Sequence, residues 1–372
     1  MSPPRTFPYL VWITACSLLL AAGCAPGEKV AVKPQIEPQK QIAEVIPQEK
    51  VPATAGETLK PQLQLEEQLP QTETPTTPPL ALKFTPQDST TYKVITEAQQ
   101  SVKWRGDVPD NPDFKDAVKL DRLEMTFTQQ IQSTDVNGNA VAKITVEGLK
   151  YHSATTDKPT VDLDSSDQND PNNPLGKIIG QSYIIEISTT GEVTKILDVK
   201  QADAVLKIPS PDPKKTLALF TPDIIKERHG TLVLPEPDKN QLHTGDSWSN
   251  IKTFSFGPMG SSSYEKIYTL KEIKDINNRQ LTIAEMTTIP APETPQDPHS
   301  KQLEVDFLDT FDNTGTYTGR LKFDLTAGKV EKYSERLDSK WSVVIPPDKK
   351  DTDEPTVLMM GAIRLYDLEK ID

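Results

Sequence analysis

Regular alternation of apolar and polar residues is the feature that most constrains the fold of this chain. Apolar side chains take every second position through Leu123–Thr128, and Val141–Val146 repeats this period shortly afterwards. Successive side chains of a β-strand point to opposite faces, so the period indicates strands with one buried face. Between the two runs, Asn137-Gly138 supplies residues that readily adopt positive φ. The sequence therefore predicts an antiparallel hairpin.

Segments of the first half have counterparts, in the same order, in the second half. The matched segments are 131–137 with 273–278, 142–145 with 284–287, and 180–193 with 319–330. The last pair adds a second hairpin to each half, with turns at Gly191 and Gly328. The matching order predicts an internal duplication. Chance convergence of hairpins is the alternative, because identity is low and the turns differ in length.

Helical signals lie between the two halves. Val199–Ile208 has apolar residues near helical spacing, Asp212-Pro213 and Thr221-Pro222 each place a capping residue before a proline, and Gly230 is a plausible stop. The predicted fold is therefore mainly β (α+β), with two similar curved antiparallel sheets joined by two or three short helices. Further strands are predicted at Lys93–Glu97, Leu303–Phe307, Trp341–Ile345 and Val357–Tyr366. Sheets with one wet face also explain an apolar content of only 35%.

The N-terminus carries an apolar run at residues 9–22, which is short for a membrane span of about 20 apolar residues. Ala21-Ala22-Gly23 then leads directly into Cys24. This stretch resembles the lipobox of bacterial lipoproteins, except that Ala21 stands where leucine is commonest. The resemblance implies cleavage between Gly23 and Cys24, and lipidation of Cys24. Ordinary secretory cleavage of the same bond is the alternative.

The lipobox also carries expectations about location and redox chemistry. Several acyl chains on Cys24 would hold the protein durably on a lipid bilayer. Ala25 follows, where some Gram-negative lipoproteins have the aspartate that retains them at the inner membrane. We therefore expect a lipid-anchored cell-envelope protein, at the outer membrane, with its periplasmic or surface face left open. Removing the leader also discards Cys16, one of two cysteines, so no disulfide is expected.

Residues 24–80 have a different composition from the remainder of the chain. They are rich in Pro, Gln and Glu and contain no aromatic side chain. Such a segment buries too little apolar surface to offset its chain entropy. We expect a disordered tether, with a wall-threading or partner-binding segment as the alternative. The predicted organisation is a signal peptide (1–23), a lipidated tether (24–80), a first β-rich repeat (81–208), a helical connector (209–240) and a second β-rich repeat (241–372).

Charge and motif content exclude several functions. The net charge of −13 and the lack of a basic stripe with interleaved aromatics argue against nucleic-acid binding. Ser263-Tyr-Glu-Lys266 has the Ser-x-x-Lys spacing of serine acyl enzymes, but it precedes a predicted strand and lacks the partner motifs. No catalytic residue is assigned, no cofactor is expected, and the chain is predicted not to be an enzyme.

The metal-ligand and aromatic candidates have structural explanations. None of His152, His229, His243 and His299 has His-x-x-x-His or Cys-x-x-Cys spacing. His229, His243 and His299 lie in apparent turns or loops, and exposed loop histidines are expected. Two acidic groups lack an EF-hand pattern and are expected to be solvated, although calcium at the first is an alternative. These groups are Asp162, Asp164, Asp167 and Asp170, and Asp306, Asp309 and Asp312. Trp248 and Trp341 are expected in the core or at a sheet edge, with sugar or peptide binding as the alternative.

Several short motifs also resemble a family of uncharacterised bacterial lipoproteins, which carry a domain of unknown function built from two β-rich repeats. The matching features are Asp164-Ser165, Gly180–Val193, Gly245-Asp246-Ser247-Trp248, and Gly319–Val330 with Phe323-Asp324. The resemblance implies an architecture and no catalytic residues. The expected function is a membrane-anchored lipoprotein whose non-catalytic β module binds or scaffolds an envelope protein or cell-wall component. The alternative is a periplasmic carrier of lipid or another apolar ligand in a half-barrel-like cavity.

Overall fold

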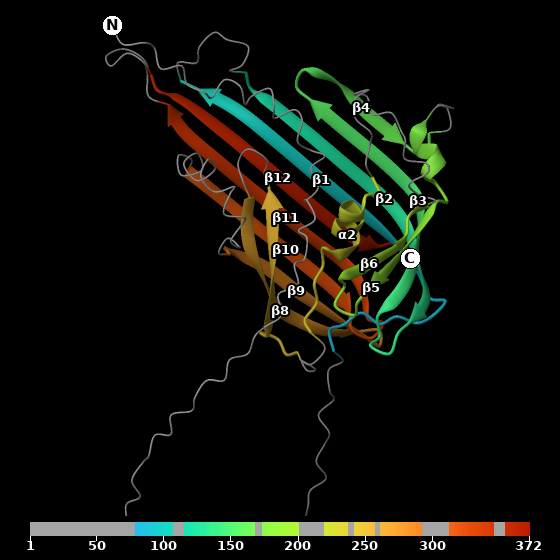
Figure 1. Ribbon diagram of the computed structural model, residues 1–372. Coiled ribbons are helices and arrows are strands. Elements are labelled where there is room, and N and C mark those ends of the chain that lie inside the picture. Colours follow the sequence, from blue (N-terminus) through green and yellow to red (C-terminus); the bar gives the residue numbers. More distant parts are fainter. Residues whose placement is uncertain are drawn as a thin grey trace, which may run out of the picture. The chain divides into compact units, whose positions relative to one another are not determined.

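The computed structural model describes residues 79–106, 115–167, 173–200, 219–236, 242–256, 261–291, 312–345 and 354–372. These residues form one antiparallel sheet of 12 strands, one α-helix and one 3₁₀ helix (Figure 1). The strands of the first half are β1 (Ser89–Arg105), β2 (Ala117–Thr134), β3 (Ala140–Thr155), β4 (Lys158–Asp164), β5 (Ser182–Ile187) and β6 (Val193–Asp198). Those of the second half are β7 (Ser247–Ser255), β8 (Ser261–Ile276), β9 (Arg279–Pro290), β10 (Asp312–Asp324), β11 (Lys329–Ile345) and β12 (Thr356–Lys370). The helices are η4 (Pro174–Ile178) and α2 (Pro222–Gly230).

The prediction of a mainly β, antiparallel fold is confirmed, but the expected separation into two sheets is wrong. The strand order is β6-β5-β3-β2-β1-β12-β11-β10-β9-β8-β7, with β4 pairing on β3. The C-terminal strand β12 lies between the halves, and its Leu368 is opposite both Val94 of β1 and Tyr333 of β11. The pairing of β12 with both neighbours merges the halves into one sheet.

The predicted duplication stays a prediction. Read across the sheet, the strands occur in descending chain order both from β6 to β1 on one side of β12 and from β11 to β7 on the other. A repeat requires the two halves to share this order. The residue pairings of the two halves differ, however. Ala142 lies opposite Ile131, whereas its proposed counterpart Ala284 lies opposite Leu270 rather than Ile273. Strand order alone cannot separate duplication from two independent meanders.

One face of the sheet, called here the inner face, holds the hydrophobic core. The cross-strand row Met125, Val94, Leu368 and Tyr333 joins β2, β1, β12 and β11 on that face. The opposite, outer face carries ion pairs, such as Lys93 Nζ to Glu124 Oε1 at 2.8 Å. This division into one dry and one wet face is what the alternating sequence pattern predicts.

Helix α2 confirms one of the predicted helix starts. The Thr221 hydroxyl accepts a hydrogen bond from the amide of Ile224, Pro222 occupies the first helical turn, and the helix ends at Gly230. The other predicted helical segments, 201–208 and 212–213, lie outside the described residues, as does the strand expected at 303–307.

The sheet curves around α2. Eight spacings separate β5 from β8 in the strand order, which is about 38 Å in a flat sheet. Yet Tyr183 of β5 hydrogen-bonds His229, and Lys266 of β8 hydrogen-bonds the carbonyl of Thr231. Two residues of backbone span about 7 Å, so these contacts require curvature. Figure 1 shows α2 on one face of the sheet, with β5 and β6 beside it.

Two hairpin turns match their sequence signals. Asn277 and Asn278, between β8 and β9, have φ of 52° and 62°, as a two-residue turn with positive φ at both positions requires. Gly138, between β2 and β3, has φ of 82°. Asparagine and glycine tolerate this region better than other residues do, so these turns set where the two hairpins reverse.

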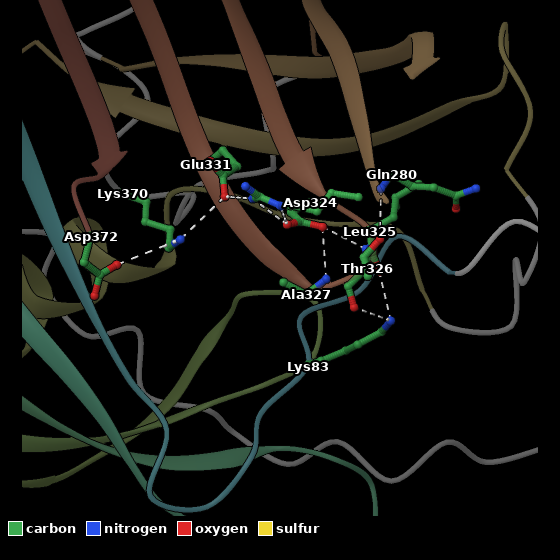
Figure 2. Close-up of polar contacts among 10 residues, drawn as sticks. Lys83, Gln280, Asp324, Leu325, Thr326, Ala327, Glu331, Lys370 and Asp372 are labelled. Carbon is green, nitrogen blue, oxygen red and sulfur yellow. Dashed lines mark hydrogen bonds and ion pairs between the residues drawn. The ribbon is translucent and has the colours of Figure 1, made fainter. Parts of the chain in front are cut away.

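A segment before β1 crosses between the hairpin turns of the two halves. The amide of Leu82 donates to the Thr189 carbonyl at 2.9 Å, and the amide of Lys83 donates to the Gly328 carbonyl at 3.0 Å. Figure 2 shows Lys83 Nζ also reaching the carbonyls of Leu325 and Thr326. Leu80 is buried in the core. The packed part of the chain therefore begins within the last residues of the predicted tether.

Candidate functional site on the inner face

A short segment after α2 is held against the inner face by hydrogen bonds from several strands. Tyr366 of β12 donates from its hydroxyl to the Arg228 carbonyl at 2.7 Å. Trp248 Nε1 of β7 donates to the Val233 carbonyl at 3.0 Å, and the Leu234 amide donates to the Thr190 carbonyl at 2.8 Å. Residues 219–236, called here the plug, therefore lie between strands of both halves.

A buried ion pair lies beside the plug. Lys266 Nζ is 3.0 Å from Glu335 Oε2 and donates to the Thr231 carbonyl at 3.1 Å. The Lys266 side chain is 0% exposed and that of Glu335 is 5% exposed. Tyr333 also donates to Glu335, at 2.7 Å, and Lys252 lies 3.4 Å from it. The carboxylate is thus surrounded by donors.

Tyrosine rings enclose the Lys266 ammonium. It lies within 5.5–5.9 Å of the ring centroids of Tyr268, Tyr317 and Tyr333, a range in which cation–π attraction operates. The hydroxyls of Tyr268 and Tyr333 hydrogen-bond each other at 2.8 Å. Burial lowers the pKa of Lys266, an effect that Glu335 opposes. Burial opposes ionisation of Glu335 as well, but Lys252 and Lys266 lower its pKa overall. Glu335 is therefore ionised at neutral pH, and its carboxylate counteracts the effect of burial on Lys266.

The contacts of Lys266 rule out the serine acyl-enzyme chemistry that the Ser-x-x-Lys spacing suggested. Ser263 and Lys266 both lie in strand β8, which begins before the predicted strand and includes the whole motif. The Ser263 hydroxyl hydrogen-bonds Thr253 at 2.8 Å, whereas Lys266 is committed to Glu335 and Thr231. Three residues of a strand place the two side chains on opposite faces. The serine and the lysine therefore do not form a nucleophile and base pair.

The expectation that His229 is an exposed loop residue is wrong. His229 lies in α2, where its Nε2 and the Tyr183 hydroxyl are 2.5 Å apart. Its ring stands edge-on to Phe127, with the centroids 4.9 Å apart. Burial of the ring, and then the charge of Arg228, lower the pKa of His229 well below its usual value. The histidine is therefore neutral and part of the packing between α2 and the sheet.

Arg228 is a buried cation without a carboxylate partner among the described residues. Its side chain is 2% exposed, and its Nη2 donates to the Leu219 carbonyl at 2.8 Å. The guanidinium carbon lies 5.3 Å from the Phe220 ring centroid. Its Nε and Nη1 are buried and have no hydrogen-bond partner. Sequence reasoning missed this residue, because an arginine in a polar nine-residue helix gives no sign of burial.

A second part of the inner face is only half-buried. Along β12, Arg364, Met360 and Leu358 lie on the same face as Tyr366, and Val102 of β1 is opposite Met360. These four residues, called here the far inner surface, are each partly exposed. Arg364 forms no ion pair with any residue that the structure describes. The far inner surface thus combines apolar side chains with a free guanidinium.

The remaining histidine and aromatic candidates separate into exposed and buried residues. His243 lies in a turn with its side chain 73% exposed, and His152 lies in β3, 3.9 Å from Asp162. Trp248 and Trp341 are buried, which confirms their assignment to the core. Trp248 stacks on Tyr268 with the rings 5.1 Å apart. His299 lies outside the described residues.

In the acidic loop at residues 162–170, the carboxylate of Asp164 is bonded to neighbouring protein groups. Asp164 pairs with Lys150 at 2.8 Å and accepts from Ser166. The bond to Lys150 and the Ser166 amide lower the pKa of Asp164 to about 2. Within the described ranges, no group of three His, Cys, Asp or Glu side chains could hold a metal ion. Asp312 begins β10, whereas Asp170, Asp306 and Asp309 lie outside the description.

Asp324, from one of the motifs shared with the resembled family, has a structural role in the β10–β11 turn. Its carboxylate accepts from the amides of Thr326 and Ala327 at 2.9 and 3.0 Å and pairs with Arg279 at 2.6 Å (Figure 2). Burial opposes its ionisation, but the Ala327 amide and Arg279 lower its pKa. A small open hollow lies nearby, lined by Lys83 and Lys329 among others. Lys329 is 2.8 Å from Asp88, and Lys83 Nζ donates to the carbonyls of Leu325 and Thr326, so both cations of this hollow have partners within the chain.

The residues that define the predicted anchor, Gly23 and Cys24, lie outside the described part of the chain, together with the leader and tether up to residue 78. Among the residues that are described, no helix is long and apolar enough to cross a membrane.

Comparisons with known proteins place the chain in no family. No family model matches it, and no curated protein matches it. One similar solved structure is described as "Lipid-protein interactions in lipovitellin", at a TM-score of 0.35 and 10% sequence identity. The match covers 78% of this chain and 26% of that one, so this chain spans about a quarter of its length. At this level the likeness shows neither a family nor a function.

Proposed function

We propose that this chain is a lipid-anchored protein of the bacterial cell envelope, whose sheet is a non-catalytic module that binds an apolar or amphipathic ligand on its inner face. The observation that carries the proposal is the far inner surface. There, Val102, Leu358 and Met360 are only partly buried, although they continue the core face of the sheet. A surface of this kind favours a ligand with an apolar part.

The anchor part of the proposal rests on the sequence. Ala21-Ala22-Gly23-Cys24 has the small residues that a signal peptidase needs before the cysteine that receives the lipid. The same argument favours the outer membrane, because Ala25 is not the aspartate of the inner-membrane retention signal. The anchor and tether would keep the sheet close to the source of an amphipathic ligand.

The non-catalytic part of the proposal rests on how the perturbed groups are used. Lys266 and Glu335 are the strongest acid–base candidates, since active sites often hold groups with shifted pKa values. Both are enclosed by tyrosines and bonded to neighbouring protein atoms. Structural ion pairs perturb pKa values in the same way. We therefore assign this pair to stability.

Replacing Cys24 with serine is expected to release the protein from membranes. The serine hydroxyl lacks the thiol that receives the lipid, so the variant should move from the membrane to the soluble fraction and lose acyl-chain labelling. Fractionation of cells expressing each form, followed by labelling with an alkyne fatty acid, measures both effects. Cys16→Ser is the matched control, because it alters the other cysteine and should leave both results unchanged. A Cys24→Ser chain that stays membrane-bound would contradict the anchor.

Native mass spectrometry of the soluble Cys24→Ser chain tests the ligand. We expect a fraction of molecules to carry extra mass in the range of a lipid, and this fraction should fall when Met360 is replaced with aspartate. A charge at that half-buried position disfavours an apolar contact. Met359→Asp, on the outer face, is the control and should leave the bound fraction unchanged. If the chain also stays free of adducts after incubation with envelope lipid extract, the binding proposal is wrong.

A further inference from the structure

One nitrogen of the Arg228 guanidinium has a hydrogen-bond acceptor among the described residues, whereas the other two nitrogens have none. Its Nη2 is bonded to the Leu219 carbonyl and its carbon lies over the Phe220 ring, 5.3 Å from the centroid. Its Nε and Nη1 are buried without a partner. Two donor atoms of a permanently charged group are thus held in place, and no carboxylate among the described residues pairs with them.

Such an arrangement is costly unless something else supplies the acceptor. A buried charge that lacks both a counter-ion and hydrogen bonds is strongly unfavourable. Ordinary burial of arginine therefore brings a carboxylate or several carbonyls to the guanidinium. Arg228 has one carbonyl. Arg279, by contrast, is bonded to both Asp324 and Glu331.

The described groups around Arg228 do not supply a negative charge. Tyr366 of β12 donates to the Arg228 carbonyl, which leaves the guanidinium untouched. From β5, the neutral Tyr183 hydroxyl is bonded to His229 and also interacts with Arg228, but it carries no charge. Glu227, its neighbour in α2, is exposed and forms no ion pair with it. Glu335 of β11 is already bonded to Lys266 and Tyr333.

The position of Arg228 relates it to the far inner surface. Tyr366, which contacts its backbone, lies on the same face of β12 as Arg364, Met360 and Leu358. From Tyr366 to Met360 the strand runs about 20 Å, comparable to a long acyl chain. The half-buried Arg364 lies between these two points and is also unpaired among the described residues.

We propose that Arg228 binds the anionic headgroup of an amphipathic ligand, a carboxylate or a phosphate attached to an acyl chain, whose tail extends along β12 over Met360. The inference rests on the proposed ligand-binding function and names the ligand class. A guanidinium suits both anions, because it presents several donors in a fixed plane. No covalent step is involved.

Binding of three probes with the same tail tests this inference in the full Cys24→Ser chain. Palmitate and 1-palmitoyl lysophosphatidate carry anions, and monopalmitin is neutral. Wild type is expected to bind at least one anionic probe more tightly than monopalmitin. Arg228→Met should weaken that anionic probe about 10- to 100-fold, the effect of losing charge-assisted hydrogen bonds. It should leave monopalmitin within about threefold.

Controls separate a binding role from a structural one. Arg122→Met removes a guanidinium that pairs with Glu97 on the outer face, and it should change no affinity. The ligand-free Arg228→Met chain is expected to keep the melting temperature of wild type, because an apolar side chain replaces an uncompensated charge. If Arg228→Met fails to fold, Arg228→Lys keeps the charge and should weaken the anionic probe to a smaller extent.

Other outcomes would overturn the inference in distinguishable ways. Equal affinity of wild type for all three probes would refute the anion site and leave the proposed function standing. Failure of all three to bind would refute both. An Arg228 variant with a large loss of melting temperature and an unchanged preference among probes would make Arg228 a structural residue, paired with a carboxylate of the chain itself. The two anionic probes separate a carboxylate ligand from a phosphate ligand.

Discussion

Replacing Glu335 with glutamine is expected to lower the free energy of unfolding by about 3–5 kcal/mol, the usual cost of removing one partner of a buried ion pair. The substitution conserves volume and removes the negative charge. Lys266, which is 0% exposed, would then lose its counter-charge and keep only neutral partners, such as the Thr231 carbonyl and three tyrosine rings. Denaturant unfolding of the full chain, followed by tryptophan fluorescence, measures the loss.

A double-mutant cycle identifies the ion pair as the cause. Lys266→Met alone should cost less than Glu335→Gln, because Lys252 and Tyr333 still bond the carboxylate. The double variant, without either charge, is expected to be more stable than Glu335→Gln alone, since no unpaired buried charge remains. Equal losses for the double variant and the sum of the singles would show that the two side chains do not interact.

The same pair explains what the sequence pattern could and could not predict. Tyr264, Lys266 and Tyr268 occupy alternate positions of one strand, so the period that predicts β8 also places a lysine on an apolar face. Glu335 stands between Tyr333 and Leu337 in the same way. A charge in phase with the buried residues was a readable signal for both. The pattern does not show that Lys266 of β8 and Glu335 of β11 meet, because β9 and β10 separate these two strands in the sheet.

Local features were predictable because neighbouring residues determine them. The Thr221 cap, the Pro222 helix start and the turn at Asn137-Gly138 each depend on a few adjacent residues. The position of β12 between β1 and β11 depends instead on residues far apart in the chain. Nothing local distinguishes two sheets from one sheet with a shared strand.

His229 shows how a tertiary contact can overturn a local prediction. It directly precedes Gly230, which marks a helix end, and helix ends are commonly exposed. The sheet curves over α2, however, and brings Phe127 and Tyr183 to the histidine from β2 and β5. Arg228 is buried by the same curvature. The candidate binding residue was therefore unpredictable without the arrangement of the sheet.

Replacing Phe127 with alanine is expected to destabilise the chain by about 3–5 kcal/mol. Phe127 is 1% exposed, and its ring contacts those of Tyr92 and His229, with centroids 5.8 and 4.9 Å away. Truncation removes apolar contacts and leaves a cavity between the inner face and α2. Urea unfolding measures the loss. Ile251→Ala, at a side chain that is 61% exposed on the edge strand β7, is the control and should change stability by less than about 0.5 kcal/mol.

The cavity itself gives a second measurement. A cavity lined by apolar side chains stays dry and can bind a small apolar molecule. Benzene is therefore expected to raise the melting temperature of Phe127→Ala and to leave that of wild type unchanged. A loss below about 1 kcal/mol would mean that the core beneath α2 collapses to fill the space. In that case α2 would be loosely packed on the sheet, and the close contact of His229 with Phe127 would not contribute to stability.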